Sequence, residues 1–238
     1  MTLGEIFSKS IRYPFSDIST LVFVGIFTLL VSLPQIVTSF GIESVTVSAL
    51  AAIISLIFGI VLSGYAVSVI KKGIDDSDDF PEIDLRTNLI NGIKALIINI
   101  AYFIIPIIIA VILAVIAGSI GVGLNNAVAA LGIFAVLVII LFIVFSILEM
   151  VAMARFADTD SLDEALKIGA VIDDIKRIGI LNIIAFLIIA FIIVFVAIIV
   201  GSLISLIPYI GIIITSVIVM AFVVLFYYKA LGLLYADA

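Results

Sequence analysis

The chain has 238 residues, of which 66% are hydrophobic and only 12% are charged, and its mean hydropathy is +1.53. A water-soluble fold cannot bury so large an apolar fraction, so this composition excludes a soluble protein. The net charge of −6 argues against a nucleic-acid partner, and the absence of cysteine and histidine excludes disulfides, thiolate chemistry and imidazole metal ligands.

Six apolar runs are each long enough to cross a bilayer, which takes about 20 apolar residues in a helix. In chain order they are Ile18–Phe40, Val45–Ile70, Ile93–Ala117, Ala127–Val151, Ile178–Leu203 and Ile210–Leu234. The connections between them are too short to bury a core of their own. We therefore predict an all-α fold, a polytopic membrane helical bundle that forms a single integral membrane domain over residues 1–238.

An amphipathic helix is expected before the first span. Thr2 and Glu5 have the spacing of a capping box, which marks a helix start. Apolar residues follow at helical spacing, and polar residues fill the opposite face. A helix of this kind lies in the interface between membrane and water.

Two further segments have the same character. The stretch Asp84–Lys94 precedes the third span, and Ser161 and Glu164 repeat the capping-box spacing before the fifth. The prediction is therefore six transmembrane helices arranged as three hairpins, each preceded by a cytoplasmic-side amphipathic interfacial helix. The similar exits of the hairpins indicate internal repeats over residues 1–75, 76–158 and 159–237.

The 11 lysine and arginine residues all fall on one side of this topology. The loops on the other side, around Gly41–Ser44, Gly118–Asn126 and Ser205–Tyr209, contain none. Cytoplasmic loops carry the excess of positive charge in membrane proteins. We therefore expect a multi-pass protein of the cell membrane with its N- and C-termini in the cytoplasm.

Three segments also resemble a known family. They are the amphipathic start of the chain, the stretch Phe80–Asp84 that leads into Gly92–Leu96, and the segment Ser161–Ile178. Together they resemble an uncharacterised, mainly archaeal family of multi-pass membrane proteins, the domain of unknown function 4013. The resemblance covers nearly the whole chain, and it implies an architecture but no chemistry.

Glu149 and Lys229 are the candidate intramembrane ion pair. Both lie near the inner ends of predicted spans. Inserting an ionised side chain costs about 2.5–3.5 kcal/mol at mid-bilayer and less toward the interface, where these two residues are expected. If the repeats pack with pseudo-symmetry, the two side chains approach each other across the bundle. Such residues form either a gate or a proton-coupled ion pair, or else a structural pair or snorkelling side chains.

Pro106 lies in the middle of the third span, where proline removes a backbone donor and kinks a helix. Asn99 and Tyr102 come one to two turns earlier, so the three residues are predicted to form a polar patch that faces the interior of the bundle. The alternative is ordinary helix packing, since side-chain hydrogen bonds also join helices in lipid.

Two other patterns are weaker signals. Ser55, Gly59 and Ser63 repeat every four residues, which favours close helix packing within the chain over a dimer seam. The acidic run Asp75–Asp79 lacks the glycine and terminal glutamate of a calcium loop. We interpret that run as solvated charge, and no metal site is predicted.

No enzyme is expected, because the sequence lacks histidine and cysteine and shows no pair of acids facing each other in the spans. No catalytic residue and no cofactor are predicted. The favoured function is a non-catalytic membrane scaffold, partner subunit or lipid-interacting protein, whose partners are membrane lipids and a cytoplasmic or membrane protein. The alternative is a transporter or channel-like protein for a small or hydrophobic substrate. The sequence does not indicate an oligomeric state.

Overall fold

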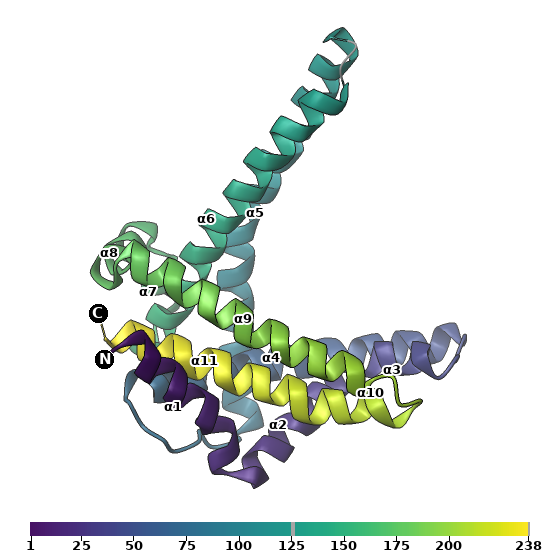
Figure 1. Ribbon diagram of the computed structural model, residues 1–238, viewed down its shortest axis with the longest axis vertical. Coiled ribbons are helices and arrows are strands. Elements are labelled where there is room, and N and C mark those ends of the chain that lie inside the picture. Colours follow the sequence, from purple (N-terminus) through teal and green to yellow (C-terminus); the bar gives the residue numbers. More distant parts are fainter. Residues whose placement is uncertain (125–126, 238) are drawn as a thin grey trace.

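The computed structural model describes residues 1–124 and 127–237, and every regular element in these ranges is helical (Figure 1). This confirms the all-helical prediction. The elements are α1 (Leu3–Ser16), α2 (Ile18–Val31), α3 (Leu33–Ser39), α4 (Val45–Ile74), α5 (Leu85–Leu124), α6 (Ala127–Thr159), α7 (Leu162–Leu166), α8 (Ile168–Ile178), α9 (Ile180–Ile204), α10 (Ile210–Ile214), the π-helix η1 (Thr215–Met220) and α11 (Ala221–Ala236).

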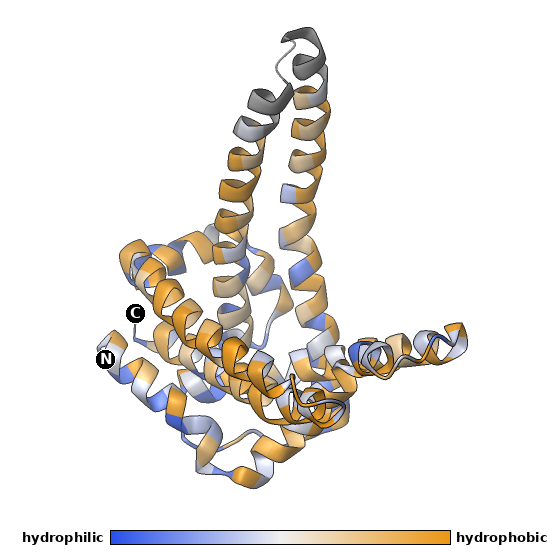
Figure 2. Ribbon diagram, turned by 45° about the vertical axis from the view of Figure 1, so that its right-hand side comes forward, coloured by the Kyte–Doolittle hydropathy of each residue, from blue (hydrophilic) through white to orange (hydrophobic). Residues whose placement is uncertain are grey.

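Five helical segments of the described chain are long and apolar enough to cross a membrane, which supports a multi-pass membrane protein. They are Val45–Ile74, Leu85–Gly118, Phe134–Thr159, Ile180–Ile204 and Ile210–Ala236. The bent pair α1 and α2, whose axes differ by 88°, is a sixth candidate if it counts as one span. Figure 2 shows that hydrophobic residues dominate the long helices, whereas hydrophilic ones gather nearer the N- and C-terminal ends of the chain.

The expected first span, Ile18–Phe40, is not one helix. Ser32 separates α2 from α3, and Pro34 is the second residue of α3. Proline lacks the N–H that a continuous helix would direct to the carbonyl four residues earlier. The Ser32 hydroxyl donates a 2.8 Å hydrogen bond back to the carbonyl of Thr28. The first span was therefore predicted with the correct start but without its break.

The segment Asp84–Lys94 does not form an interfacial helix of its own. It supplies the first turns of α5, which runs without interruption from Leu85. No proline and no positive φ angle occurs between Leu85 and the interior Pro106, so nothing in the backbone separates these turns from the span. The expectation of a separate amphipathic helix before the third span was wrong.

Sharp turns connect the shorter helices to the spans. Asp17 is extended between α1 and α2, and its carboxylate accepts hydrogen bonds from the Ser19 amide and the Thr20 hydroxyl. Such side-chain capping satisfies donors at the start of α2. Gly179 separates α8 from α9 with a φ angle of +90°, a conformation that glycine adopts without a steric penalty.

Helix α4 is the centre of the packing, since it contacts α2, α3, α5, α6 and α11. Glycine makes the closest approaches possible. Gly64 of α4 lies against the backbone of Asn88 and Gly92 in α5, and Gly73 lies against Gly232 in α11. The α5–α6 hairpin then diverges from the group that contains α4, α9 and α11 (Figure 1). The spans are thus joined most tightly at the end where α4 and α11 finish and α5 begins.

Candidate functional site

Charged side chains from distant parts of the sequence meet near the two chain termini, which lie close together beside α1, α8 and α11 (Figure 1). We call this region the charged end and define it by residues of its polar contacts: Lys9, Lys71, Asp76, Arg155, Asp160, Glu164, Asp174 and Lys229. The Lys9 ammonium lies 2.8 Å from the Asp76 carboxylate, which joins α1 to the turn after α4. Lys71 at the end of α4 pairs with Asp160 between α6 and α7.

Arg155 holds helices α7 and α8 against the end of α6. Its guanidinium lies 2.8 Å from the Glu164 carboxylate and 2.9 Å from that of Asp174. Its Nε also donates to the Glu164 carbonyl at 3.1 Å. Arginine suits this position because its planar fork can donate to several acceptors at once.

Asp174 connects this network to the last helix. The Tyr235 hydroxyl of α11 donates to the Asp174 carboxylate at 2.9 Å, and the guanidinium of Arg177 lies 4.8 Å from the centre of the Tyr235 ring. Asp174 is only 8% exposed, so its charge is compensated by partners rather than by water. Three helices, α6, α8 and α11, are thereby fixed to one carboxylate.

Hydrogen bonds also shift the titration of acids at this end. The Lys167 ammonium and the Arg155 guanidinium both donate to the Glu164 carboxylate, and they lower its pKa. The Thr87 hydroxyl and the Arg86 amide lower the pKa of Asp84 in the same way. Both carboxylates are therefore held in the ionised form.

Lys229 is fully buried, with 0% of its surface exposed. Its ammonium donates to the carbonyl oxygens of Lys72 at 3.1 Å and Ser77 at 2.5 Å, and it lies 4.9 Å from the centre of the Tyr13 ring. The Lys72 carbonyl belongs to the last turn of α4, where the helix dipole favours a positive charge. Lys229 therefore fastens the loop after α4 to α11.

The predicted ion pair between Glu149 and Lys229 is not formed. The Lys229 ammonium is satisfied by carbonyl oxygens and an aromatic face, and it points toward α4 instead of α6. The Glu149 carboxyl makes no hydrogen bond or ion pair with the described residues. Helix α4, rather than α6, packs against the Lys229 face of α11.

The predicted patch of Asn99, Tyr102 and Pro106 is divided among different contacts. The Asn99 amide donates to the Ala95 carbonyl of its own helix at 2.9 Å. The Tyr102 hydroxyl donates to the Ala165 carbonyl of α7 at 2.8 Å and is buried. Pro106 is buried inside α5, which continues past it. These residues support helix packing, the alternative interpretation, rather than a shared polar site.

The motifs at residues 55–63 and 75–79 have structural contacts of their own. The Ser55 hydroxyl donates to the Val31 carbonyl of α2, whereas nothing lies within 4 Å of a Cβ placed on Gly59. Asp76, in the acidic run, pairs with Lys9. Within residues 1–124 and 127–237, no group of three or more acidic side chains could hold a metal ion.

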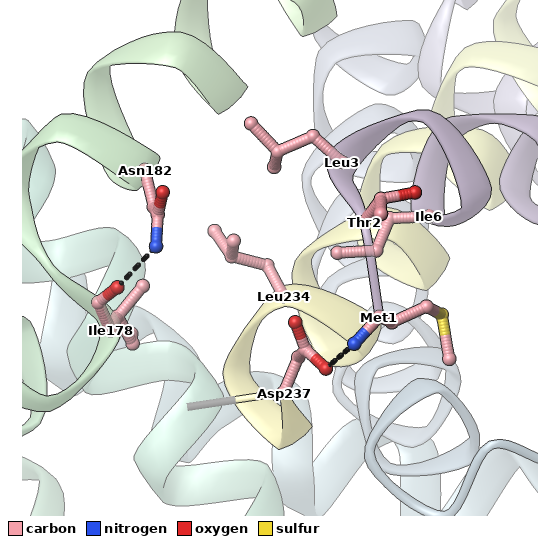
Figure 3. A pocket seen from close by; sticks show the side chains of 8 residues that line it. All are labelled: Met1, Thr2, Leu3, Ile6, Ile178, Asn182, Leu234 and Asp237. Carbon is pink, nitrogen blue, oxygen red and sulfur yellow. Dashed lines mark hydrogen bonds and ion pairs between the residues drawn. The ribbon is translucent and has the colours of Figure 1, made fainter.

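Among the cavities between the described helices, three bear on a binding function. The first, of 310 Å³, lies between the start of the chain, the α8–α9 turn and α11 (Figure 3), where Asn182 donates to the Ile178 carbonyl and the N-terminal amine pairs with Asp237. The second, of 400 Å³, is an apolar groove between α9 and α11 that includes Tyr227 and Tyr228. The third, of 380 Å³, has serine, threonine and glutamine side chains in its walls and lies at the opposite end of the bundle.

Sequence reasoning missed the two most polar arrangements. It did not connect Arg155 with Glu164 and Asp174, which α7 and α8 bring back to it. It placed Ser32 inside the first span and Ser205 in a loop, and it did not bring the two serines together. Their clustering next to a proline and a glycine was the available signal.

The comparisons with known proteins bear on the family alone. The model of a family described as "Protein of unknown function (DUF4013)" matches residues 47–206, which is more than half of the chain. The matched region runs from the start of α4 to the end of α9 and includes Arg155, Glu164 and Asp174. No curated protein and no solved structure matches the chain. The expected resemblance is confirmed, and this chain belongs to the DUF4013 family of proteins of unknown function.

Proposed function

We propose that this protein is a non-catalytic membrane scaffold whose charged end binds lipid head groups and docks a cytoplasmic or membrane protein partner. The observation that carries the proposal is the set of polar contacts that fastens α1, α7 and α8 to the ends of α4, α6 and α11. A fixed array of short helices at one end of a membrane bundle is a surface on which another molecule can assemble.

Two of the short helices at this end, α1 and α8, have the character of interfacial helices. In α1 the buried side is formed by Ile6, Phe7 and Tyr13 among others, and Lys9 lies outside it. In α8 the buried positions are Val171, Asp174 and Ile178. The 88° angle between α1 and α2 supports an orientation of α1 along a membrane surface if α2 enters the membrane.

The charge distribution supports an orientation with both termini in the cytoplasm. The N-terminal amine pairs with Asp237, so the two ends of the chain lie on the same side of the bundle. The lysines and arginines of the ion pairs lie at that same end. Because positive residues are retained on the cytoplasmic side, this end faces the cytoplasm in our proposal.

A transporter for a hydrophobic substrate is the second candidate, and the apolar groove between α9 and α11 favours it. The groove is lined by Leu187, Ala190, Phe191, Val194, Val223, Val224, Tyr227 and Tyr228. Its volume of 400 Å³ lies within the range of small-molecule sites. It lacks charged lining residues, so an ion or a sugar is a poor match for it.

Single-cysteine labelling separates the two candidates, since the native chain has no cysteine. Asn99→Cys and Glu149→Cys report on the middle and inner part of the spans, and Asp78→Cys and Lys176→Cys report on the charged end. For a scaffold, a membrane-impermeant maleimide labels only the charged-end variants. Labelling of the Asn99 and Glu149 variants at comparable rates contradicts the scaffold and supports a water-accessible pathway.

A second measurement tests the lipid contact itself. In vesicles that contain anionic phosphatidylglycerol, we expect slower amide hydrogen exchange in α1 and α8 than in vesicles of neutral phosphatidylcholine. The central turns of α9 are the internal control, because they carry no charged residue. Equal exchange of α1 and α8 in both vesicles contradicts binding of anionic head groups.

A further inference from the structure

The polar cavity away from the charged end is built where helices are interrupted. Its walls come from the α2–α3 break, the end of α9 and the π-helix η1. The lining residues are Ser32, Gln35, Ile198, Gly201, Ser202, Ser205, Leu206, Ile212, Thr215, Ser216, Val219 and Met220. Interrupted and π-helical segments in membrane proteins free backbone groups and often form binding sites.

Close contacts hold the three walls together. A Cβ on Gly25 of α2 would lie 2.3 Å from the Val217 carbonyl oxygen, so only glycine permits this approach to η1. The Thr28 hydroxyl donates to the Ser216 carbonyl at 2.5 Å, and both residues are buried. On the other side, the Thr215 hydroxyl donates to the Gly201 carbonyl of α9 at 2.9 Å. The cavity is therefore formed by a rigid junction.

The hydroxyl protons of this cavity are already used. Those of Ser32, Ser202 and Ser216 are donated to the helix carbonyls four residues earlier. Thr215 donates to Gly201, so in its 3.0 Å contact with Ser205 the serine must be the donor. Each hydroxyl oxygen keeps lone pairs that can accept. The cavity thus offers mainly acceptors to a ligand.

The cavity is also electrically neutral. None of its lining residues is ionisable. The C-terminal end of α9 lies beside the N-terminal end of α10, and the end of α2 meets the start of α3, so the opposite partial charges of these helix ends offset each other. The exposed Gln35 carboxamide makes no hydrogen bond with the described residues and adds one further acceptor and two donors.

We propose that this cavity binds a small neutral molecule rich in hydroxyl groups, a glycerol-type polyol, either free or as the head of a neutral lipid. Its hydroxyls donate to the serine and threonine oxygens and exchange hydrogen bonds with Gln35. The volume of 380 Å³ equals that of about a dozen water molecules, which leaves room for such a ligand. Ile198, Leu206 and Met220 face its carbon skeleton or the first part of an acyl chain.

The test uses a thiol inside the cavity. Ser202→Cys is reacted with N-ethylmaleimide in lipid nanodiscs, alone and with glycerol or dioctanoylglycerol. Ser146→Cys is the matched control, because Ser146 also donates to the carbonyl four residues earlier but lies on α6, outside the cavity. The O-methyl ethers of glycerol and dioctanoylglycerol serve as control ligands, because they keep the carbon skeleton and lose the hydroxyl donors. In the double variant Gln35→Leu/Ser202→Cys, the polyol concentration that protects the thiol from alkylation by N-ethylmaleimide should rise about three- to tenfold, the range expected for one lost hydrogen bond.

Two results support the proposal and identify the source of the ligand. Protection of the Ser202 variant by glycerol but not by its trimethyl ether indicates a free polyol. Protection by dioctanoylglycerol alone, and not by its methyl ether, indicates a lipid head. The proposal is overturned if neither probe protects, if the ethers protect equally, or if Ser146→Cys is protected to the same extent. Because these readouts involve only the far end of the bundle, they can fail while the scaffold assignment stands.

Discussion

Replacing Gly64 by alanine should separate α4 from α5. A Cβ at Gly64 would lie 1.7 Å from the Asn88 carbonyl oxygen and 2.6 Å from the Gly92 nitrogen. Both are backbone atoms, so no side-chain rotation relieves the clash, and contacts below 3.0 Å are essentially never observed for a Cβ. The two helices must therefore move apart by more than 1 Å. A radial gap of about 0.5–1 Å already removes a quarter to a half of the attraction between packed atoms.

We expect this substitution to lower the free energy of unfolding by about 1–3 kcal/mol, as insertion of a methyl group into a tight contact does. Gly59→Ala is the matched control, because it lies in the same helix and nothing lies within 4 Å of its added Cβ. Its higher helix propensity should stabilise the protein by up to about 1 kcal/mol. Unfolding in mixed detergent micelles, followed by circular dichroism, measures both. If the two variants differ by less than about 0.5 kcal/mol, within the usual range for neutral surface changes, the glycine contact does not hold the helices together.

Two further outcomes follow from the charged end and its turns. Glu164 has a lowered pKa in the folded state, so its contribution to stability is present above its unfolded value of 4.5 and is lost as the pH falls through the folded value. Because intrinsic amide exchange itself slows in acid, the measurement is the protection factor of the α7 amides, which should fall as the pH drops, and Glu164→Gln should remove that pH dependence. Gly179→Ala forces a residue with a Cβ to adopt a φ angle of +90° and should destabilise the α8–α9 turn by about 1–2 kcal/mol. The control is Gly169→Ala, which has open space around the added Cβ and should be neutral or stabilising. Thermal unfolding of the two variants measures the difference.

The sequence predicted the fold class because apolar runs of bilayer length admit few alternatives. Five of the six expected spans correspond to candidate membrane-crossing segments. The capping box at Thr2 marks the start of α1, and the Ser161 hydroxyl caps the start of α7, although the Glu164 carboxylate binds Arg155 and Lys167 instead of returning to Ser161. The break at Ser32 and the π-helix at Thr215–Met220 were not predicted. An average of hydropathy over a whole apolar run does not reveal an interruption of this kind. The three internal repeats stay a prediction.

The side-chain partners were harder to predict than the helices. Lys229 was assigned to Glu149 on the assumption of symmetric packing, but it binds the Lys72 and Ser77 carbonyls. Backbone acceptors leave no pattern in the sequence. The close contacts of Gly64 and Gly73 were missed for a related reason. The prediction rested on a regular small-residue motif at residues 55–63, whereas the glycines that contact neighbouring helices have no fixed spacing.

Lys229 also imposes an order on biosynthesis. The carbonyls to which it donates belong to residues 157 and 152 positions earlier in the chain. While a ribosome is still synthesising the later helices, the Lys72 and Ser77 carbonyls lack this donor, and the segment after α4 is held by its contacts with α1, such as the Lys9–Asp76 pair. It gains its full set of contacts only after the last helix has been made, so a protease should cut that segment faster in a truncated nascent protein than in the complete one.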